Sequence, residues 1–469
     1  ISLKKQSEVF MTLSRSTPNK NVNLDFNKEF INNFTDKIEL SDIKFINDTL
    51  KNLHESDVAN LIENLSNESR TKLLEIEGFN INPEIFIELN ESIQSEVLQN
   101  LSTNSVINIL KKLESDNSIK ILENLDKEKK EIILENLPPK DKFLLEEGLS
   151  YPEDSAARIM QREFTAVPSK WNVGETIDYL RENKDLPKEF SEIFIVDNDF
   201  KPVGTVSSSR VLRTPRDTKM NSIMVEMPVL ISVNMDKEEV GLTFENYNLI
   251  SAGVVNKDNK LVGMITADDV VTVVQEEAEE DTLRLAGVGD EEITDSVLIK
   301  TKRRFNWLLL NLFTALLATW VISNFGASIE QMVALAFLMP IVASMGGNAG
   351  MQTLAVTIRA IAKKELSSSN FNRVVGKEFI IGILNGVIFA IITAIIVHLW
   401  FEEVNLSLLI GVSMVLNMIV AGLFGILVPV SLKRMNIDPA LASSVFVTTI
   451  TDIIGFLSFL GLGSYYFLN

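Results

Sequence analysis

Apolar and polar residues alternate in three different ways along the chain, and the changes of pattern mark its domains. Residues 1–45 are polar without a regular period, which predicts a flexible lead-in with room for one helix. Short helical patterns recur over 46–150, and paired strand–turn–strand patterns occupy 151–274. An acidic stretch, 275–300, leads into long apolar runs over 301–469. The fold class predicted is therefore multidomain: a helical superhelix, an α/β pair, a connector helix and an all-α membrane domain.

The region 46–150 repeats one motif of two apolar residues, two variable residues and a leucine. Copies begin at Leu61, Ile85, Val97, Ile109, Ile121 and Ile133, on a 12-residue interval, with looser copies at Thr49 and Leu73. Each copy predicts a short amphipathic helix that cannot bury its apolar face alone, whereas stacked neighbours can. We therefore expect a small helical superhelix here, with a generic helical bundle as the alternative.

Two similar units fill 151–274, and each has an apolar strand, an Asp/Asn turn, a second strand and a helix. They resemble a tandem pair of CBS domains, which often bind adenine nucleotides. That resemblance implies that a Thr/Ser and an Asp after the second strand hold the ribose, a pattern that Thr266 and Asp269 match. The first unit has Ser207 but Arg210 where the Asp would fall. We expect at most one nucleotide site, and a purely structural pair is the favoured interpretation.

The connector 275–300 begins with a run of carboxylates. They are Glu276, Glu277, Glu279, Glu280 and Asp281, with Asp290, Glu291, Glu292 and Asp295 beyond them. Carboxylates three or four positions apart on one helix face repel each other. A solvated helix start is one interpretation, and a face built to be neutralised by divalent cations is the other. Because the run lies beside Asp268-Asp269 and next to the membrane region, we favour a cation sensor.

Five apolar runs in the membrane region are each long enough to span a bilayer. They cover about 305–325, 331–360, 378–400, 406–432 and 439–468. Lys and Arg precede the first run and fill the loops after the second and fourth, while the other two loops have none. By the positive-inside rule, this alternation places the N-terminus in the cytosol and the C-terminus outside.

Charge and composition narrow the function. The net charge of -19 is concentrated before residue 300, which argues against nucleic acid as a partner because nucleic-acid binding needs a basic face. There are no cysteines and two histidines, so disulfides are excluded and a zinc site is not expected. The chain has no Walker A stretch, so ATP-driven pumping is unsupported. We expect a membrane transport protein, not an enzyme.

Asp452 is the single charged residue of the last apolar run. A carboxylate at membrane depth is costly unless it meets water, a partner or an ion, so we predict that it lies in a cation pathway. Its predicted companions in the pore are Thr448, Thr449, Asn348, Gln352 and Gly347. Thr448 and Thr449 share its helix face, the two amides lie four positions apart on one face, and Gly347 allows close backbone approach.

These oxygen ligands suit Mg²⁺, Ca²⁺ or Mn²⁺, and Mg²⁺ fits best because it keeps its waters and needs acceptors for them. Two chains related by a twofold axis would bring two copies of Asp452 to one divalent ion. We therefore predict a homodimeric Mg²⁺ channel. The alternatives are a channel or transporter for another divalent cation, such as Co²⁺ or Mn²⁺, and a nucleotide-sensing membrane receptor.

The chain resembles the MgtE family of bacterial magnesium channels over almost its whole length. The matching stretches are His54–Ala59, Tyr151–Ala156, Pro340–Gln352 and Asp438–Gly455. The resemblance implies a bacterial plasma-membrane homodimer with its pore between the subunits and Asp452 as the main ion-binding group. ATP binding to the CBS pair is known in some members, so ATP joins Mg²⁺ as an expected ligand.

The same resemblance implies that cytosolic Mg²⁺ binds acidic residues between the helical domain, the CBS pair and the connector and holds the pore closed. The sensor carboxylates that it indicates are Asp116, Glu238, Asp269, Glu277 and Glu280, beside Glu276 of the acidic run. Asp438 is expected at the inner mouth of the pore.

Overall fold

The chain divides into two compact units, Ile1–Val271 and Thr272–Asn469. The structure is a computed structural model, and it describes residues 26–76, 82–187, 190–226, 229–288, 297–441 and 443–468. The predicted connector carboxylates Asp290, Glu291, Glu292 and Asp295 lie outside the described residues. The fold class predicted from the pattern is confirmed, with a helical N-terminal region, paired modules with small sheets and long apolar helices at the C-terminal end.

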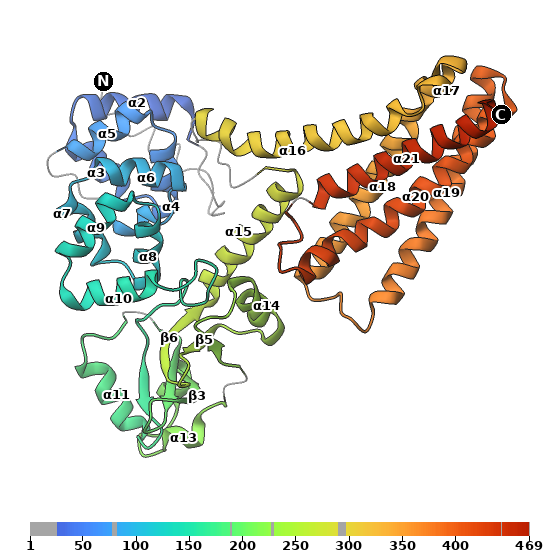
Figure 1. Ribbon diagram of the computed structural model, residues 1–469. Coiled ribbons are helices and arrows are strands. Elements are labelled where there is room, and N and C mark those ends of the chain that lie inside the picture. The colour runs from blue at the N-terminus through green and yellow to red at the C-terminus, as the bar shows by residue number, and fades with distance from the viewer. Residues whose placement is uncertain are drawn as a thin grey trace. The chain divides into compact units, whose positions relative to one another are not determined.

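The N-terminal region is a stack of short helices around one apolar core (Figure 1). Its helices are α2 Lys28–Glu39, α3 Ile43–Leu50, α4 Glu55–Glu63, α5 Asn67–Glu75, the 3-10 helix η1 Pro83–Phe86, α6 Glu91–Asn100, α7 Thr103–Leu110, α8 Ser115–Glu123, α9 Lys127–Asn136 and α10 Pro139–Leu149. Phe34 and Ile38 of α2 are buried in this core, one helical turn apart. Residues 28–45 are therefore not part of a flexible lead-in, and the helical domain begins earlier than predicted.

The predicted 12-residue repeat is confirmed by burial. The residue that opens each copy is buried in the shared core, namely Leu61, Leu73, Ile85, Val97, Ile109, Ile121 and Ile133. Side-chain caps keep several of the helices short, because a capping oxygen takes a backbone N–H at the start of the helix. Ser66 caps α5 and Ser102 caps α7 in this way.

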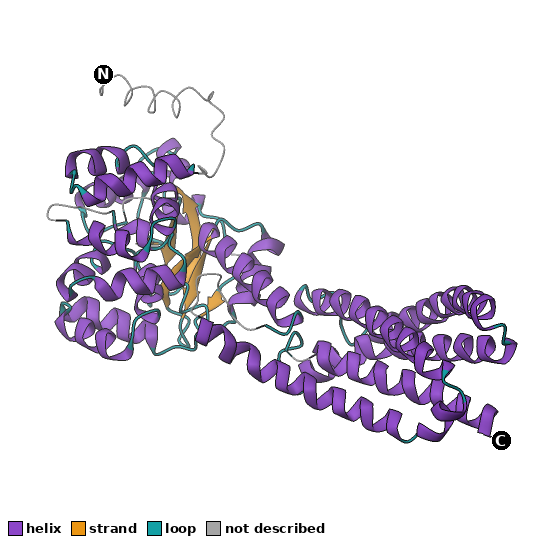
Figure 2. Ribbon diagram, turned by 90° about the horizontal axis from the view of Figure 1, so that it is seen from above, coloured by secondary structure: helices purple, strands orange, loops and turns teal. Residues whose placement is uncertain are grey.

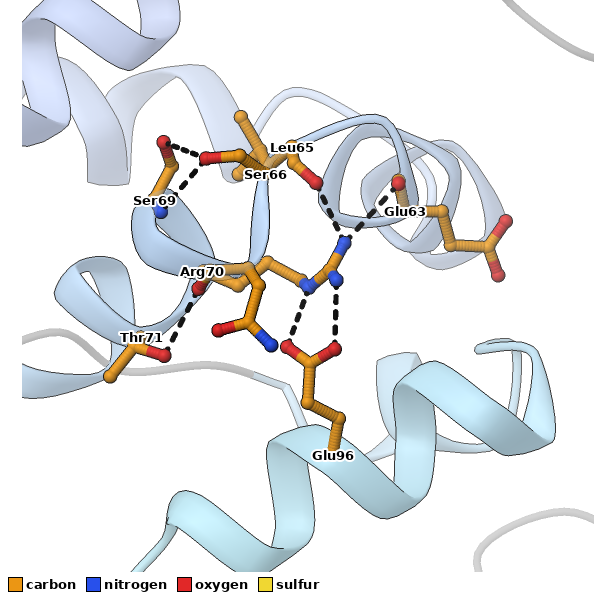
Figure 3. A network of polar contacts seen from close by, with 8 residues as sticks. Glu63, Leu65, Ser66, Ser69, Arg70, Thr71 and Glu96 are labelled. Carbon is orange, nitrogen blue, oxygen red and sulfur yellow. Dashed lines mark hydrogen bonds and ion pairs between the residues drawn. The ribbon is translucent and has the colours of Figure 1, made fainter. Parts of the chain in front are cut away.

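An ion pair joins two neighbouring helices of this stack (Figure 3). Arg70 of α5 donates from Nε and Nη2 to the two carboxylate oxygens of Glu96 in α6, at 3.0 and 2.9 Å. Its Nη1 donates to the carbonyl of Leu65 at 2.7 Å. Arg70 is only 8% exposed, so these partners supply the hydrogen bonds that water no longer provides.

The paired modules each contain a three-stranded sheet, shown in orange in Figure 2. The first contains β1 Ala166–Pro168, α11 Val173–Glu182, β2 Glu192–Val196, β3 Pro202–Ser207, α12 Ser208–Arg213 and α13 Met220–Ile223, and the second contains β4 Ile231–Ser232, α14 Lys237–Tyr247, β5 Ser251–Val255 and β6 Leu261–Thr266. In each sheet the first two strands are parallel and the last two form the predicted antiparallel hairpin.

The two modules exchange edge segments. Ala156 and Met160, which precede the first module, are buried in the core of the second. Gln161 exchanges backbone hydrogen bonds with Met264 of β6 at 2.7 and 2.8 Å. Val225 follows the first module and pairs in the same way with Thr205 of β3. The segment that enters the pair therefore links the helical stack directly to the second module.

The second unit begins within α15 and contains the membrane helices. Its elements are α15 Ala267–Leu285, α16 Val297–Ser323, α17 Gly326–Gln331, α18 Ala334–Ala362, α19 Phe371–Phe401, α20 Val404–Arg434 and α21 Ser443–Leu468. Five of these helices are long and apolar enough to span a membrane, as predicted. The last begins at Ser443 instead of Pro439, because Asp438 Oδ1 accepts from Ala440 N at 2.8 Å in a turn before the helix.

Glycines set the close packing of the membrane helices. α18 contacts α20 and α21, α19 contacts α20, and α16 contacts α21. A Cβ on Gly382 of α19 would lie 2.9 Å from the carbonyl oxygen of Met418, and one on Gly386 would lie 3.0 Å from Val415 Cα. These two glycines therefore allow α19 and α20 to pack closely.

Candidate ion pathway and carboxylate clusters

Helix α18 divides into a buried glycine face and an exposed amide face. Gly346 and Gly350 are buried against neighbouring helices, whereas Asn348 and Gln352 are exposed in the single chain. Because the two amides are four positions apart, they share one helix face, as predicted. Neither amide makes a hydrogen bond with another side chain or carbonyl within the described part of the chain.

Helix α21 presents the predicted hydroxyls and the carboxylate. Thr448 Oγ1 donates to the carbonyl of Ser444 at 2.9 Å, and Thr449 Oγ1 donates to that of Val445 at 2.6 Å. Asp452 is half-buried and lies one turn after Thr448. Its carboxylate forms neither a hydrogen bond nor an ion pair with any described residue.

The two helices meet at Gly347. A Cβ on Gly347 would lie 4.0 Å from both Thr448 Cγ2 and Thr451 Oγ1. The glycine of α18 therefore faces the threonines of α21, which places Gly347 and Thr448 at one contact between the two helices. Thr451, which the sequence did not single out, is fully buried and donates to the carbonyl of Val447 at 3.0 Å.

The exposed groups of this pair of helices are mostly hydrogen-bond acceptors. Because Thr448 and Thr449 donate their hydroxyl hydrogens to helix carbonyls, their oxygens are left to accept from water or to bind a cation. The amide oxygens of Asn348 and Gln352 and the carboxylate of Asp452 add further hard oxygen atoms. Such a set suits a hydrated divalent cation, which presents water hydrogens to its surroundings.

In the first unit, Asp116 is a buried carboxylate at the start of α8. It is 7% exposed, and its Oδ1 has no hydrogen-bond partner within the described residues. Burial, followed by repulsion from Asp269, raises the pKa of Asp116 well above its usual range. The predicted pair Asp116 and Asp269 is therefore brought together between the helical stack and the second module.

Two further carboxylates, Glu114 and Glu163, join this pair. Gln161 Nε2 donates to Glu114 Oε2 at 2.9 Å and to Asp269 Oδ2 at 3.2 Å. Burial and then the charges of Glu163 and Asp269 raise the pKa of Glu114. Burial also raises the pKa of Asp269. The carboxylates of this cluster are therefore harder to ionise than usual, and a bound cation would offset the cost of their negative charges.

No three His, Asp or Glu side chains of the described residues are arranged to hold a metal ion together. The carboxylates of this cluster interact electrostatically at longer range, and they do not surround one point as metal ligands would. Glu238 lies at the exposed start of α14, and Glu276 lies on the exposed face of α15. The carboxylates that act on Asp116 are other groups, Asp269, Glu114 and Glu163.

Glu280 of the connector and Asp438, which stands just before α21, share a cation that the chain itself supplies. Arg284 of α15 forms ion pairs with both. Burial, and then the charges of Asp438 and Glu277, raise the pKa of nearby Asp281 to about 6. The structure therefore brings together Glu277, Glu280 and Asp438 of the predicted sensor set, with Arg284 among them.

The end of the connector also packs on the helices of the candidate pathway. Leu285 of α15 joins an apolar cluster with Leu354 and Ile358 of α18 and Val447 of α21. The connector therefore contacts both helices that carry the predicted pore residues.

The predicted nucleotide residues Thr266 and Asp269 lie together after β6. Thr266 Oγ1 donates to Asp269 Oδ2 at 2.6 Å. Asp269 thus belongs both to this pair and to the carboxylate cluster of Asp116. The adenine-nucleotide site remains a prediction.

Three participants in the clusters were not predicted. Glu114 stands two positions before Asp116 in an acidic turn, so its place beside Asp116 could have been predicted from the sequence. Glu163 accepts from Ser115, 48 residues earlier, and Arg284 pairs with Asp438, 154 residues later. Nothing in the local sequence indicates partners at such separations.

Family models match three consecutive parts of the chain. A model of the MgtE intracellular N domain matches residues 53–154, models of the CBS domain match 156–217 and 220–276, and a model described as a divalent cation transporter matches 339–462. The magnesium transporter MgtE of Bacillus subtilis (strain 168) is 31% identical over 317 residues, which cover 67% of this chain and 70% of the relative. The chain belongs to the MgtE family of magnesium transporters.

A second MgtE transporter is similar to this chain to about the same extent. The magnesium transporter MgtE of Enterococcus faecalis (strain ATCC 700802 / V583) is 30% identical over 320 residues, 68% of this chain and 71% of the relative. Among solved structures, the soluble part of a magnesium transporter is 22% identical and covers 54% of this chain and 99% of that one, with a TM-score of 0.47. Membership of the MgtE family, together with five apolar helices, makes this a multi-pass membrane protein.

Proposed function

We propose that this chain forms a homodimeric channel in the bacterial plasma membrane, through which Mg²⁺ enters the cell down its electrochemical gradient. Cytosolic Mg²⁺ then closes the channel by binding its acidic cytosolic surfaces. A membrane potential of about 100 mV, negative inside, contributes roughly 4–5 kcal/mol to the entry of a divalent ion. No coupled ATP hydrolysis is needed for such a flux.

The observation that supports this proposal most is the carboxylate of Asp452 on a membrane-spanning helix, which has no hydrogen-bond or ion-pair partner among the described residues. Such a group is expensive in a bilayer unless an ion or water compensates it. Its neighbours are acceptor oxygens on the same helix, from Thr448 and Thr449. A hydrated Mg²⁺ ion supplies both the charge and the hydrogen-bond donors that this surface lacks.

A second copy of the chain explains the exposed amide face of α18. Asn348 and Gln352 are exposed in the single chain, within an apolar span. Lipid cannot satisfy such amides, whereas a water-filled path between two subunits can. In a twofold dimer the two copies of Asp452 carry two negative charges, which one divalent ion neutralises.

The experiment is Mg²⁺ uptake into proteoliposomes that contain the full-length chain and an enclosed Mg²⁺ indicator. Asp452→Asn keeps the shape of the side chain and removes its charge, and we expect it to abolish uptake. Glu330→Gln makes the same change on the exposed surface of α17 and should leave uptake intact. Uptake of Co²⁺ or Mn²⁺ in place of Mg²⁺ would favour a channel for another divalent ion. Unchanged uptake by Asp452→Asn would overturn the pore role and favour a nucleotide-sensing receptor.

The two carboxylate clusters support closure by Mg²⁺. At low Mg²⁺, burial and then the charges of Asp269, Glu114 and Glu163 disfavour the ionised form of Asp116 and raise its pKa. Divalent ions bridge these carboxylates at high Mg²⁺, and α15 transmits the change to α18 and α21 through Leu285. Moving a gate from mostly open to mostly closed needs about 5 kcal/mol of differential binding, which several weak sites together can supply.

Closure is tested by neutralising the acidic run of α15. A channel with Glu276, Glu277, Glu279 and Glu280 changed to glutamine should keep conducting at millimolar internal Mg²⁺. Normal closure of that variant would remove this run from the sensor. ATP is proposed as a further ligand at Thr266 and Asp269, and an ATP-induced rise in melting temperature that Thr266→Ala removes would support it.

A further inference from the structure

Asn417 of α20 packs against both helices that present the predicted pore residues. It is 0% exposed. A Cβ on Gly346 of α18 would lie 2.1 Å from Asn417 Nδ2, and a Cβ on Gly455 of α21 would lie 2.8 Å from the same atom. The side-chain amide therefore occupies the space that these two glycines leave open.

The amide is also tied to the backbone of α18. Asn417 Nδ2 donates to the carbonyl oxygen of Val342 at 2.8 Å. Val342 stands one turn before Gly346, so the hydrogen bond and the glycine contact act on adjacent turns of α18. A directional bond to a helix carbonyl restrains the rotation of that helix, whereas apolar packing alone restrains mainly its distance.

Stability by itself does not account for an asparagine at this position. The other amide atom, Asn417 Oδ1, is buried without a hydrogen-bond partner among the described residues. A buried polar atom without a partner costs more than a typical buried hydrogen bond gains. A leucine of similar size would fill the same space without that cost, which points to a role other than holding the bundle together.

The position of Asn417 connects it to both halves of the candidate pathway. Gly346 directly precedes Gly347 and lies two residues before Asn348, and Gly455 lies three residues after Asp452. The spacing and rotation of α18 against α21 at this level set how far the amide of Asn348 lies from the carboxylate of Asp452. A hydrated ion is sensitive to that separation because its waters must reach both groups.

We propose that Asn417 is a positioning residue for cation conduction: its side-chain amide, held on the Val342 carbonyl between Gly346 and Gly455, sets the spacing and rotation of α18 against α21. This inference rests on the proposed function, in which both helices line the ion pathway. Asn417 itself does not touch the ion.

The first test is Asn417→Leu in the full-length protein. We expect a several-fold loss of Mg²⁺ flux and a changed ratio of Mg²⁺ to Co²⁺ flux, while the melting temperature stays equal or rises. Asn385→Leu is the matched control, because Asn385 is an exposed amide on membrane helix α19 and should tolerate the change. Wild-type flux and selectivity in Asn417→Leu would overturn the proposal, as would a loss of flux that follows a fall in melting temperature.

A double variant separates space filling from the hydrogen bond. Gly346→Ala places a methyl group where Asn417 Nδ2 now lies, and Asn417→Ala vacates that space. The variant with both changes should recover the melting temperature that Gly346→Ala loses, yet keep the low flux of Asn417→Ala. Full recovery of flux would show that packing alone matters and would overturn the positioning role.

Helix geometry can be measured without transport. The chain has no cysteines, so Gly347→Cys with Thr448→Cys gives one defined pair across the contact of α18 and α21. The rate of oxidative cross-linking should change several-fold when Asn417→Leu is added, and an equal rate would overturn the inference. If the wild-type chain carries no cation at all, the proposed function fails, and this cross-linking rate still decides whether Asn417 positions the helices.

Discussion

The Arg284 guanidinium pairs with the Asp438 carboxylate, 154 residues further along the chain. Arg284 also pairs with Glu280, one turn earlier in α15. Because Asp438 stands just before α21, this arrangement joins the connector helix to the segment that leads into the helix of Asp452. The cation that lies between two predicted sensor carboxylates is thus a side chain of the protein.

The first prediction is that Arg284 competes with Mg²⁺ for these carboxylates. A divalent ion that binds Glu280 and Asp438 has to displace the guanidinium, so Arg284→Gln should lower the Mg²⁺ concentration that half-protects α15 from limited proteolysis. Ion pairs this exposed contribute up to about 1 kcal/mol, so we expect a shift of about fivefold at most. Arg213→Gln, an exposed arginine of α12, is the control. A higher Mg²⁺ requirement would mean that Arg284 assists closure.

The second prediction concerns pH. Burial, Asp438 and Glu277 raise the pKa of Asp281 from 3.8 to about 6. Between these values the folded protein binds more protons than the unfolded chain, so this group makes stability fall as the pH rises, until the loss is complete above about 6. Asp281→Asn should flatten that part of the melting-temperature profile in Mg²⁺-free buffer. Asp217→Asn is the control, because Asp217 is an exposed aspartate in the turn before α13, and it should leave the profile unchanged. An unchanged slope would contradict the raised pKa.

The third prediction concerns Asp116. Its buried charge is opposed by Asp269, so Asp116→Asn should raise the melting temperature of the full-length protein in Mg²⁺-free buffer. Added Mg²⁺ should stabilise the wild type, by about 2.7 kcal/mol when free Mg²⁺ is about a hundred times its dissociation constant. The variant should lose most of that gain, and Asp217→Asn should keep it. Equal stabilisation of all three proteins would exclude this cluster as a Mg²⁺ site.

The fourth prediction concerns the packing of α19 on α20. Gly382→Val would push a side chain into the backbone at Met418 and Ile419, where nothing can rotate away. We expect a loss of about 1–3 kcal/mol of stability, measured by thermal unfolding in detergent. Gly376→Val is a control on the same helix, because a Cβ at Gly376 meets no atom within 4 Å. Equal losses in both variants would assign the effect to helix propensity and not to packing.

Local pattern was sufficient for the elements and for several functional residues. The 12-residue repeat predicted helices whose opening residues, such as Leu61 and Ile121, are buried, because a period of 3.6 residues determines which face of a helix turns inward. Apolar run length predicted the membrane helices in the same way. Asp452 could be found from sequence because a lone carboxylate in an apolar span is unusual by composition alone.

Two features were not predicted from the pattern. The stretch around Phe34 and Ile38 does carry apolar residues at helical spacing, with Phe30 one turn earlier, and these side chains pack into the core of the helical stack. Asn417 is the second: nothing in the sequence around it indicates a special role. Its importance lies in two glycines on two other helices, Gly346 and Gly455, which only the folded bundle brings to it.

The sequence by itself determined the order of domains, the membrane spans, the acid-rich connector and the lone aspartate of the last helix. These are properties of short windows, in which hydrophobic period and charge act directly. The tertiary structure alone decided that Asp269 acts electrostatically on Asp116, that Arg284 pairs with both Glu280 and Asp438, and that Asn417 packs against glycines of both α18 and α21. Such contacts join residues far apart in the chain, and they depend on how whole helices pack, which no local pattern specifies.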